Sequence, residues 1–348
     1  MAPSATRTSS ESALSSTIKS QNVGVFTNPE HELYIKNGPV PAPGPGECLI
    51  HVRATGICGS DIHFWKSGHI GDMIVVGENR LGHESAGVVV AVGEGVNRFK
   101  LGDRVALECG IPCMEATCYY CRTGKYNACP DVVFFSTPPY HGTLARYHVH
   151  PQEWLHKLPD TLSFEEGSLL EPLSVALAGI DRSMLRLGDP IVICGAGPIG
   201  LVTLLATHAA NRLATAKKLI PRVNTVKIVV GETPKDSAAR IKEALGFEAK
   251  IVFECTGVES SVQSAIYSCT FGGLVFVIGC GKDFQIHAIL IHYRYKDTYP
   301  KAIGLVAAGL LDLKPLVTHR YTLEQGEDAF KTASDPKAKA IKVQILDE

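Results

Sequence analysis

Hydrophobic and polar positions follow two different patterns along the chain, and the pattern changes near residue 185. Between residues 21 and 155 the apolar runs are short, and Gly, Pro and Asp turn residues separate them. Runs of this kind at 47–55, 85–93 and 103–108 predict strands. The first part of the chain is therefore expected to be rich in β-structure.

Beyond residue 185, apolar runs of strand length alternate with helical patterns. The predicted strands cover 191–197, 224–230, 250–257 and 273–279, and the predicted helices cover 198–219, 237–246 and 260–270. Strands that alternate with helices are typical of a doubly wound parallel sheet. The chain is therefore predicted to belong to the α/β class, with a β-rich domain followed by a parallel-sheet domain.

The segment GAGPIG at 195–200 has the G-x-G-x-x-G spacing of a dinucleotide-binding turn. Such a turn joins a strand to a helix whose N-terminus suits a pyrophosphate. The same fingerprint calls for an acidic residue roughly 20 residues further on, where it binds the adenosine ribose. After Gly200, the first acidic residue is Glu232. The sequence therefore leaves the choice between NAD and NADP open.

Composition and charge narrow the classes of function. The 348 residues suggest about two domains. The net charge of −1 gives no electrostatic reason to expect binding to nucleic acid or to an anionic membrane. The uncharged stretch 190–211 could span a bilayer by length, but a glycine turn, Pro198 and His208 interrupt it, so a strand, turn and helix are predicted instead. Residues 1–20 lack the apolar region of a secretory signal, which predicts a flexible tail and a cytoplasmic protein.

Eleven cysteines are many for a chain without a secretory signal, and their spacing indicates a metal site. Cys113, Cys118, Cys121 and Cys129 follow one another in the order C-x4-C-x2-C-x7-C. Four thiolates so close in sequence can hold a structural zinc ion in a tetrahedral site. Cys109 lies just upstream and could replace the first ligand, so the identity of that ligand is open at this stage.

A second group of potential metal ligands is spread along the chain. Cys58, His83, Glu84 and Glu171 together supply sulfur, nitrogen and carboxylate oxygen. A catalytic zinc site uses this mixture and keeps one position free for water or substrate. Glu171 interrupts an apolar helical segment, where a carboxylate is costly unless it is paired or bound to a metal.

In combination, these motifs resemble those of the zinc-dependent medium-chain alcohol dehydrogenases. They are GHE at 82–84, the four-cysteine loop, and GAGPIG downstream of a glutamate-proline helix. GICGSD at 56–61 and EPLSVAL at 171–177 are similar to the polyol branch of that family, which includes sorbitol, xylitol and L-arabinitol dehydrogenases. FFSTPPYHGTL, ECTGVESS and YRYKDTYP extend the resemblance along nearly the whole chain.

The resemblance implies a domain plan and an activity. It implies a GroES-like catalytic domain at 21–178 after the tail at 1–20, a Rossmann cofactor domain at 179–318, and a C-terminal return to the catalytic domain at 319–348. The implied reaction is the zinc-dependent oxidation of a small polyol to a ketose, with hydride transfer to NAD. The implied cofactors are one catalytic zinc, one structural zinc and NAD. The implied assembly is a homo-oligomer, often a tetramer.

The same resemblance assigns roles around the catalytic zinc. Cys58, His83 and Glu84 match its ligands, and Glu171 matches a carboxylate that binds the zinc directly or through its water. Ser60 and His63 occupy the positions of a proton relay. The catalytic residues that the resemblance implies are therefore Ser60, His63 and Glu171.

Further roles concern the cofactor and the substrate. The implied cofactor turn consists of Gly195, Gly197, Pro198, Ile199 and Gly200. Arg294 and Tyr295 match residues that contact the polyol or the cofactor, and Phe64 stands in the substrate pocket where sorbitol dehydrogenases often have Tyr.

The chain departs from the family in two places. After the helix that begins at Pro198, a glycine, a strand and its terminal acid are missing together, so the predicted helix 198–219 represents two fused helices. A second shortening lies between 281–287 and 289–295 and removes sheet-edge material that family members use in subunit pairing. The cofactor domain is therefore predicted to lack a strand.

Two hypotheses follow from the missing strand. The segment 225–230 would move into the vacancy, which would bring Glu232 toward the ribose; the alternative is that Glu232 is an ordinary loop residue. At the level of function, the alternative to an active polyol dehydrogenase is a catalytically impaired variant of the same fold. A quinone or enoyl reductase fits poorly, because such enzymes generally lack both zinc sites.

Overall fold

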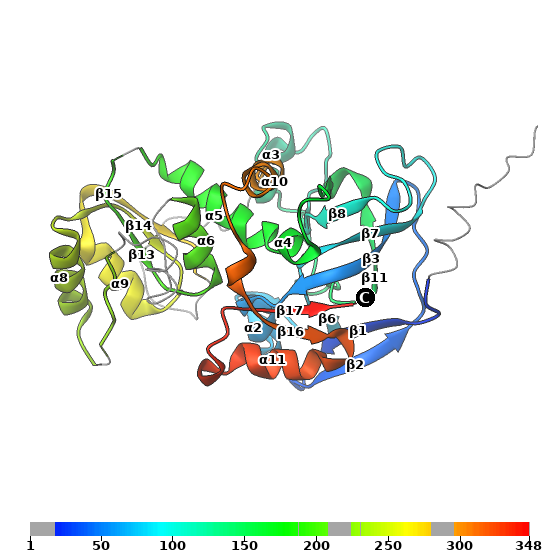
Figure 1. The fold of residues 1–348 in the computed structure, drawn as a ribbon, viewed down its shortest axis with the longest axis horizontal. Helices are drawn as coiled ribbons and strands as arrows, with labels where there is room; N and C mark the ends of the chain where they lie inside the picture. The colour runs from blue at the N-terminus through cyan, green and yellow to red at the C-terminus, as the bar shows by residue number, and fades with distance from the viewer. Residues whose placement is uncertain (1–17, 187, 208–223, 230, 280–295, 348) are drawn as a thin grey trace, which may run out of the picture. The chain divides into compact units, whose positions relative to one another are not determined.

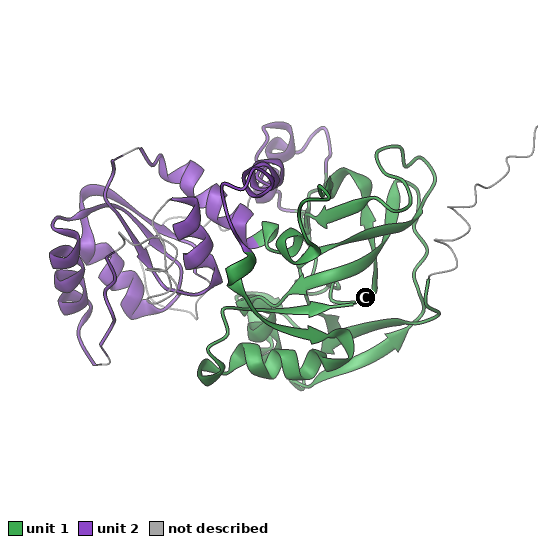
Figure 2. Ribbon diagram, in the orientation of Figure 1, with its two compact units in different colours: residues 1–113, 131–171, 314–348 green, residues 114–130, 172–313 purple. Residues whose placement is uncertain are grey.

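The computed structural model describes residues 18–186, 188–207, 224–229, 231–279 and 296–347. The chain divides into two units (Figure 2). Unit 1 contains residues 1–113, 131–171 and 314–348, and unit 2 contains residues 114–130 and 172–313. The sequence analysis places domain limits after residues 178 and 318, whereas the two units divide after residues 171 and 313. The predicted domain limits stay predictions.

Unit 1 is built on a seven-stranded sheet (Figure 1). Its strands are β12 (Leu155–Lys157), β8 (Arg104–Leu107), β7 (Glu84–Val92), β3 (Glu47–Gly56), β17 (Lys342–Leu346) and β16 (Val317–Thr322), in that order, with β11 (Tyr147–Pro151) also pairing with β3. All pairs are antiparallel except β16 with β17. The strands predicted at 47–55, 85–93 and 103–108 are confirmed as β3, β7 and β8.

Smaller elements complete unit 1. They are the sheet of β2 (Leu33–Gly38), β1 (Asn22–Thr27) and β6 (Asn79–Arg80), the pairs β4 (His69–Ile70) with β5 (Met73–Ile74) and β9 (Gly110–Ile111) with β10 (Val133–Phe134), and the helices α2 (Gly59–Ser67), α4 (Phe164–Ser168) and α11 (Gly326–Ser334). One hydrophobic cluster joins α2, α11, β1 and β17 through Phe64, Phe330, Val25 and Val343. The C-terminal part of the chain is therefore packed into the core of the unit that the N-terminal part begins.

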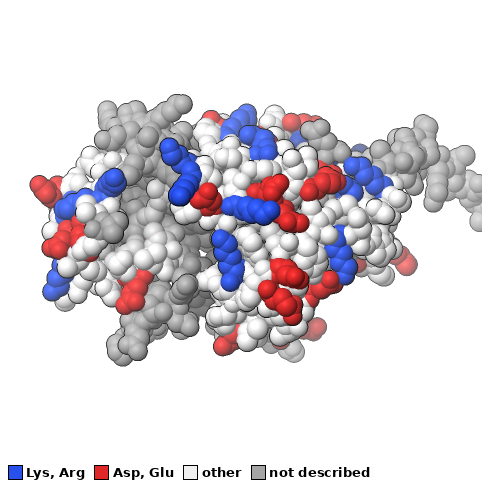
Figure 3. Space-filling model, turned by 90° about the horizontal axis from the view of Figure 1, so that it is seen from below, with Lys and Arg blue, Asp and Glu red and all other residues white. Residues whose placement is uncertain are grey.

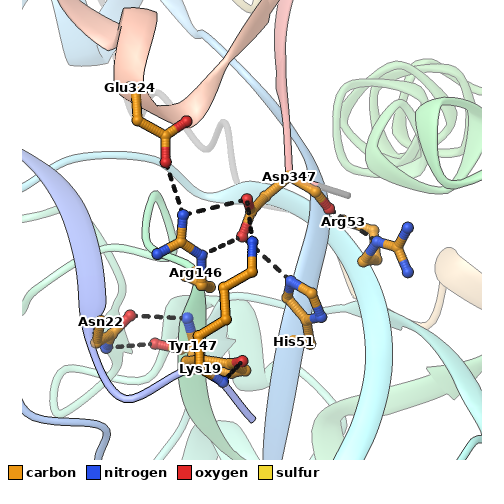
Figure 4. Close-up of polar contacts among 8 residues, drawn as sticks. All are labelled: Lys19, Asn22, His51, Arg53, Arg146, Tyr147, Glu324 and Asp347. Carbon is orange, nitrogen blue, oxygen red and sulfur yellow. Dashed lines mark hydrogen bonds and ion pairs between the residues drawn. The ribbon is translucent and has the colours of Figure 1, made fainter. Parts of the chain in front are cut away.

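A polar cluster fastens the end of the chain to the centre of the sheet (Figure 4). The Asp347 carboxylate accepts hydrogen bonds from Arg146 Nε at 2.7 Å and His51 Nε2 at 3.1 Å, and Arg53 Nε donates to the Asp347 carbonyl at 2.8 Å. Burial opposes ionisation of Asp347, but these partners outweigh it and lower the pKa of that carboxyl group. Because Asp347 directly follows β17, the cluster holds that strand in register beside β3.

Unit 2 contains a parallel sheet in the order β13 (Ile191–Cys194), β14 (Ala249–Glu254) and β15 (Cys269–Val277). Its longer helices, of which α5 begins at the end of unit 1, are α5 (Leu170–Ser183), α6 (Pro198–Ala206), α8 (Pro234–Leu245), α9 (Glu259–Ser268) and α10 (Tyr299–Ala307). Ile251 and Phe253 of β14 are buried in its core. The predicted alternation of strands and helices is thereby confirmed for β13, α8, β14, α9 and β15.

The predicted continuous helix 198–219 is wrong in its length. α6 ends at Ala206, and Thr207 forms its C-cap. The Thr207 hydroxyl donates to the carbonyl of Thr203 at 2.9 Å, and such a side-chain bond to a carbonyl of the last turn competes with continuation of the helix. The remainder of the predicted helix, from residue 208, lies outside the described residues.

The predicted strand at 224–230 is also wrong for the residues that the structure describes, 224–229, which form no strand. Hydrogen bonds join this segment to helix α8. Asn224 Nδ2 donates to the carbonyl of Ala244 at 2.7 Å, and Arg240 donates to the carbonyl of Lys227. Within the described residues, β13 pairs with β14 alone, so the segment does not occupy the predicted vacancy as a strand.

The molecular surface carries both signs of charge. On the face drawn in Figure 3, Lys and Arg side chains are interspersed with Asp and Glu, and no large area of one sign is visible. In the described parts of the chain, no helix is long and apolar enough to cross a membrane.

Two buried histidines stand on one face of β11. His148 and His150 pack against Phe135, with ring centroids 4.6 Å and 5.4 Å away, and against each other at 5.6 Å. Burial lowers the pKa of His150 to about 3 and places the pKa of His148 well below its ordinary value. Both imidazoles are therefore neutral in the folded protein at neutral pH.

We expect unit 1 to lose stability on mild acidification. His150 has a lower pKa folded than unfolded, so its contribution is complete above about pH 6.5 and is lost as the pH falls from there toward 3. Between pH 7 and pH 5 this residue alone should remove about 2 kcal/mol from the free energy of unfolding. Denaturant unfolding followed by tryptophan fluorescence isolates unit 1, because both tryptophans, Trp65 and Trp154, lie there.

The matched variants are His150→Gln and, as a control at an exposed site, His69→Gln. His150→Gln should flatten the dependence of stability on pH, whereas His69→Gln should keep it. Equal slopes in the two variants would show that the buried imidazole does not carry this acid sensitivity.

Candidate functional site

The candidate active site forms in unit 1 where β3, α2 and β7 meet. β3 ends at Gly56, and Cys58 follows as the N-cap residue of α2. β7 begins at Glu84, which pairs with Gly56 across the sheet. This geometry brings ligand atoms of Cys58, His83 and Glu84 within 4.8 Å of one another. Residues from two distant predicted motifs are thus gathered at one point.

The Glu84 side chain is enclosed by Gly56 and Lys342. A Cβ atom at position 56 would lie 2.1 Å from Glu84 Oε2, so the glycine leaves the space that the carboxylate fills. Lys342 Nζ donates to Oε1 at 2.9 Å and to Oε2 at 2.6 Å, and both side chains are 1% exposed. Burial disfavours the ammonium, but Glu84 and the neighbouring Cys58 outweigh this and raise the pKa of Lys342.

The His83 imidazole lies beside a buried carboxylate. Its Nδ1 is 3.5 Å from Oδ1 of Asp61, and Asp61 also accepts hydrogen bonds from the backbone N–H groups of Cys58 and Gly82 and from the Ser136 hydroxyl. Burial opposes both charges, but the pair outweighs it: the pKa of His83 is raised and that of Asp61 is lowered. A carboxylate behind a histidine is the usual way to orient an imidazole toward a metal ion.

The donor set fits zinc. Cys58 offers sulfur, His83 offers nitrogen and Glu84 offers oxygen. Cys58 is the N-cap of α2, Glu84 is the first residue of β7, and His83 directly precedes it. Zinc accepts each of these donors, and three protein ligands leave a fourth position for water or substrate. Within the described residues, this trio is one of two groups of three or more potential ligands close enough to hold a metal ion.

Glu171, Ser60, His63 and Phe64 lie around this trio without joining it. Glu171 is buried in the first turn of α5, outside the set of ligand atoms within 4.8 Å, so its role at the zinc stays a prediction. Ser60 and His63 lie on α2 and are half-buried. Phe64 is 3% exposed in a hydrophobic cluster, and its place in the substrate pocket stays a prediction.

The second group of potential ligands is the four-cysteine loop. The sulfur atoms of Cys113, Cys118, Cys121 and Cys129 lie within 4.8 Å of one another, and the Cys118 and Cys129 sulfurs are 4.0 Å apart. Four converging thiol groups fit a structural zinc ion. Cys109 is not in this group: it lies in the hydrophobic core, and burial raises the pKa of its thiol. The geometry therefore favours Cys113 as the first ligand.

The glycines of the predicted cofactor turn have three different surroundings. Gly195 has a φ of 102°, and a Cβ there would lie 2.7 Å from Thr256 Cγ2. A Cβ at Gly200 would lie 2.1 Å from the carbonyl oxygen of Gly195. Gly197 is the N-cap of α6 and has open space around it. A tight turn, close packing of helix on strand and an open approach to the helix N-terminus are the features that a pyrophosphate site requires.

The other predicted cofactor and substrate residues are only partly described. Pro198 and Ile199 are the first residues of α6, whereas Arg294 and Tyr295 lie outside the described residues. A cavity of about 590 Å³ in unit 2 is lined by β13, Gly195 and Glu232, among others.

Glu232 is engaged by protein groups in that cavity. Its carboxylate accepts hydrogen bonds from the Val229 N–H at 2.9 Å and from Arg240 Nη1 at 2.6 Å. These contacts, led by the Val229 N–H, lower the pKa of Glu232. Its predicted approach to a ribose stays a prediction.

Two buried residues of the site escaped the sequence analysis. Asp61 stands in the first turn of α2, where an acidic residue is ordinarily part of a helix cap. It does accept the backbone N–H of Cys58 in that capping box, and it also accepts the N–H of Gly82 at the site. Lys342 is 258 residues from Glu84, and a lysine in a C-terminal strand reads as exposed. One signal could have identified Lys342: it begins a strand whose next three residues, Val343 to Ile345, are all buried.

A sheet that carries a mixed-donor metal trio and a parallel sheet with a dinucleotide turn are the features expected of a zinc-binding dehydrogenase. Residues 44–160 match the family model described as the alcohol dehydrogenase GroES-like domain. An L-arabinitol 4-dehydrogenase of Penicillium rubens is 48% identical over 95% of this chain and 96% of its own length. Sorbitol dehydrogenase of Rattus norvegicus is 40% identical over 94% of this chain and 96% of its own length.

A solved structure shares the fold of this chain. An oxidoreductase of unknown specificity from Escherichia coli is 35% identical, with a TM-score of 0.84 over 94% of this chain and 99% of its own. The chain belongs to the zinc-type medium-chain polyol dehydrogenase family. The predicted resemblance and fold class are thereby confirmed, and a catalytic zinc, a structural zinc and NAD are the cofactors expected of this family.

Cys113 of the four-cysteine loop and the nearby Cys109 provide a matched test of the four-cysteine site. Cys113→Ser should lower the zinc content from about two ions per chain to about one, because it removes a converging ligand. Cys109→Ser should keep two ions, because that thiol lies in the core. Zinc content measured by plasma emission spectroscopy distinguishes the two variants, and loss of zinc from Cys109→Ser with retention in Cys113→Ser would reverse the assignment.

Proposed function

We propose that the protein oxidises a small polyol to the corresponding ketose and transfers the hydride to NAD. The observation that carries the proposal is the convergence of Cys58, His83 and Glu84. It is supported by relatives named L-arabinitol 4-dehydrogenase and sorbitol dehydrogenase, which align over nearly the whole chain. L-arabinitol, xylitol and sorbitol are the candidate substrates.

The trio would hold a zinc ion that, when bound, polarises the substrate hydroxyl group. The protein's own residues then have two tasks, which are to orient the ligands and to remove a proton. Asp61 is placed for the first task, since its carboxylate lies beside the ligand His83. Glu171 is retained in the proposal as a buried carboxylate near the site, able to hold a water molecule or the zinc.

Ser60 and His63 are placed for the second task. They are three residues apart on α2, immediately after the ligand Cys58, so they lie on neighbouring positions of one helix face. We propose that the Ser60 hydroxyl accepts the proton from the substrate while it donates its own proton to His63. The imidazole of His63 then releases a proton to solvent, a role suited to that group.

The cofactor would bind at the turn between β13 and α6. Gly197 leaves open space at the N-terminus of α6, where backbone N–H groups and the helix dipole favour a pyrophosphate. The proposal takes the cofactor to be NAD, as in the resemblance, with the ribose contact unassigned. Arg294 and Tyr295 are retained as proposed contacts to polyol or cofactor.

One observation favours the alternative, a catalytically impaired variant of the same fold. Among the described residues, β13 has no strand on the side away from β14, where the family's ribose-binding strand would lie. The similarity to dehydrogenases over 95% of the chain favours the active enzyme. A homo-oligomer and a cytoplasmic location complete the proposal, and light scattering of the purified chain would test the first of these.

A steady-state screen tests the activity. L-arabinitol, xylitol and sorbitol should be compared, each with NAD⁺ and with NADP⁺, by the absorbance of the reduced nicotinamide. We expect turnover of at least one polyol with NAD⁺, and loss of that turnover after removal of zinc by a chelator. No turnover of any pair, together with no binding of either cofactor by calorimetry, would favour the impaired variant.

Variants of α2 test the proton path. Ser60→Ala should lower kcat by about 100-fold. Ser67→Ala, at the other end of the same helix, should leave kcat unchanged. His63→Gln should lower kcat at low buffer concentration and recover with added imidazole, because a small base can replace a terminal proton acceptor. Normal kcat in both Ser60→Ala and His63→Gln would remove these residues from the mechanism.

A further inference from the structure

Lys342 is a buried cation at the proposed metal site, and no role is assigned to it so far. It is the first residue of β17, whose Gln344 pairs with Gly56 of β3. Just beyond that pair, Ile57 N–H donates to the Val343 carbonyl at 3.1 Å. The chain therefore returns over 250 residues to place an ammonium group beside the ligands Cys58 and Glu84.

All three protons of the ammonium group are used. Lys342 Nζ donates to Glu84 Oε1 at 2.9 Å, to Glu84 Oε2 at 2.6 Å and to the Ile57 carbonyl at 3.1 Å. An ammonium group has three donors and no acceptor. With its side chain 1% exposed and its donors satisfied, Lys342 has no hydrogen bond left for a substrate. Its contacts are directed to one ligand and to the backbone next to another.

The Glu84 carboxylate is fixed from two sides. On one side it fills the space left by Gly56, where a Cβ would lie 2.1 Å from Oε2. On the other side Lys342 contacts both oxygens. A carboxylate has about four lone-pair sites, so it can accept from a lysine and still bind a metal ion.

In the metal-free site, local charge favours this contact. Asp61, Glu84 and Glu171 are all buried, and Cys58 must be a thiolate to bind zinc. Without a cation, the Glu84 carboxylate would be repelled by these neighbours and drawn toward water. Lys342 supplies that cation within the protein itself.

We propose that Lys342 is a positioning residue for the metal site, which holds the Glu84 carboxylate in the orientation that completes the zinc ligands. The inference rests on the proposed function of Cys58, His83 and Glu84 as that site. Asp347, just after β17, contacts His51 of β3 and Arg146, which directly precedes β11 (Figure 4). The C-terminal segment that carries Lys342 is thereby fixed beside β3.

Lys342 could affect zinc affinity in two opposite ways, and the direction of the change in Lys342→Met distinguishes them. A positive charge near a metal site weakens cation binding, whereas a group that orients a ligand strengthens it. If orientation dominates, Lys342→Met lowers zinc affinity, by about 10- to 100-fold as for other partners of ligands. If the charge alone matters, the same variant binds zinc more tightly.

The matched control is another lysine–glutamate pair of the same unit. Lys36 Nζ lies 2.6 Å from Glu78 Oε2, the same distance as in the buried pair, but the two side chains are 49% and 47% exposed. Lys36→Met removes the same chemical group from a solvated pair. It should therefore leave zinc affinity unchanged.

The experiment measures zinc affinity of the full chain by competition with a chromophoric chelator. Wild type, Lys342→Met and Lys36→Met are compared, and Lys342→Arg should recover part of the affinity because it keeps the charge and its donors. In Co²⁺-substituted protein, the visible bands of the mixed-donor site should change in Lys342→Met, whereas those of the four-cysteine site should persist. A purely structural role would leave the cobalt bands of folded protein unchanged.

A second route keeps the test decisive if Lys342→Met does not fold. Gly56→Ala retains Lys342 but fills the space of the Glu84 carboxylate, whose flexible end must then move. We expect it to lower zinc affinity as well. In a Glu84→Gln background, adding Lys342→Met should cause no further loss, because the lysine acts through the carboxylate.

The outcomes separate the inference from the proposed function. If wild type binds two zinc ions and Lys342→Met binds both with unchanged or higher affinity, the positioning role is wrong and the metal site stands. If wild type binds zinc only at the four cysteines, the proposed active site is wrong and the role of Lys342 falls with it. Weakened binding in Lys342→Met, with normal binding in Lys36→Met, supports the inference.

Discussion

The buried carboxylate of Glu84 is the constraint on which the active-site architecture depends. A charge that is 1% exposed is tolerated only with a partner, and here the partner is equally buried. Three features follow from it: a glycine at position 56 opposite the carboxylate, a lysine at position 342, and a C-terminal strand that returns to the centre of the sheet. The site therefore depends on both ends of unit 1.

The chemistry of the site was largely predictable, but its supporting charges were not. Cys58, His83 and Glu84 were identified by donor type and by resemblance, and the structure brings them together. Asp61 and Lys342 were missed because their signals are ambiguous in one sequence: an acid in a first helical turn reads as a cap, and a distant lysine reads as exposed. Contacts over 258 residues depend on strand order, which local patterns do not encode.

The predicted strands that the structure confirms are all paired with a neighbouring strand. β3, β7, β13 and β14 were found from apolar runs, and each is paired in a sheet. The segment 224–229 has a similar apolar pattern, yet it forms no strand, and the Arg240 side chain of α8 binds the carbonyl of Lys227. A strand is a property of a pair, so apolar pattern alone overpredicts strands where a partner is missing.

The central claim is that Cys58, His83 and Glu84 form a zinc site distinct from the four-cysteine loop. Anomalous diffraction at the zinc absorption edge, from crystals of the full chain, tests it most directly. The account predicts two peaks per chain, one of them about 2.0–2.3 Å from the Cys58 sulfur, a His83 nitrogen and a Glu84 oxygen. A single peak, confined to the four cysteines, would contradict it.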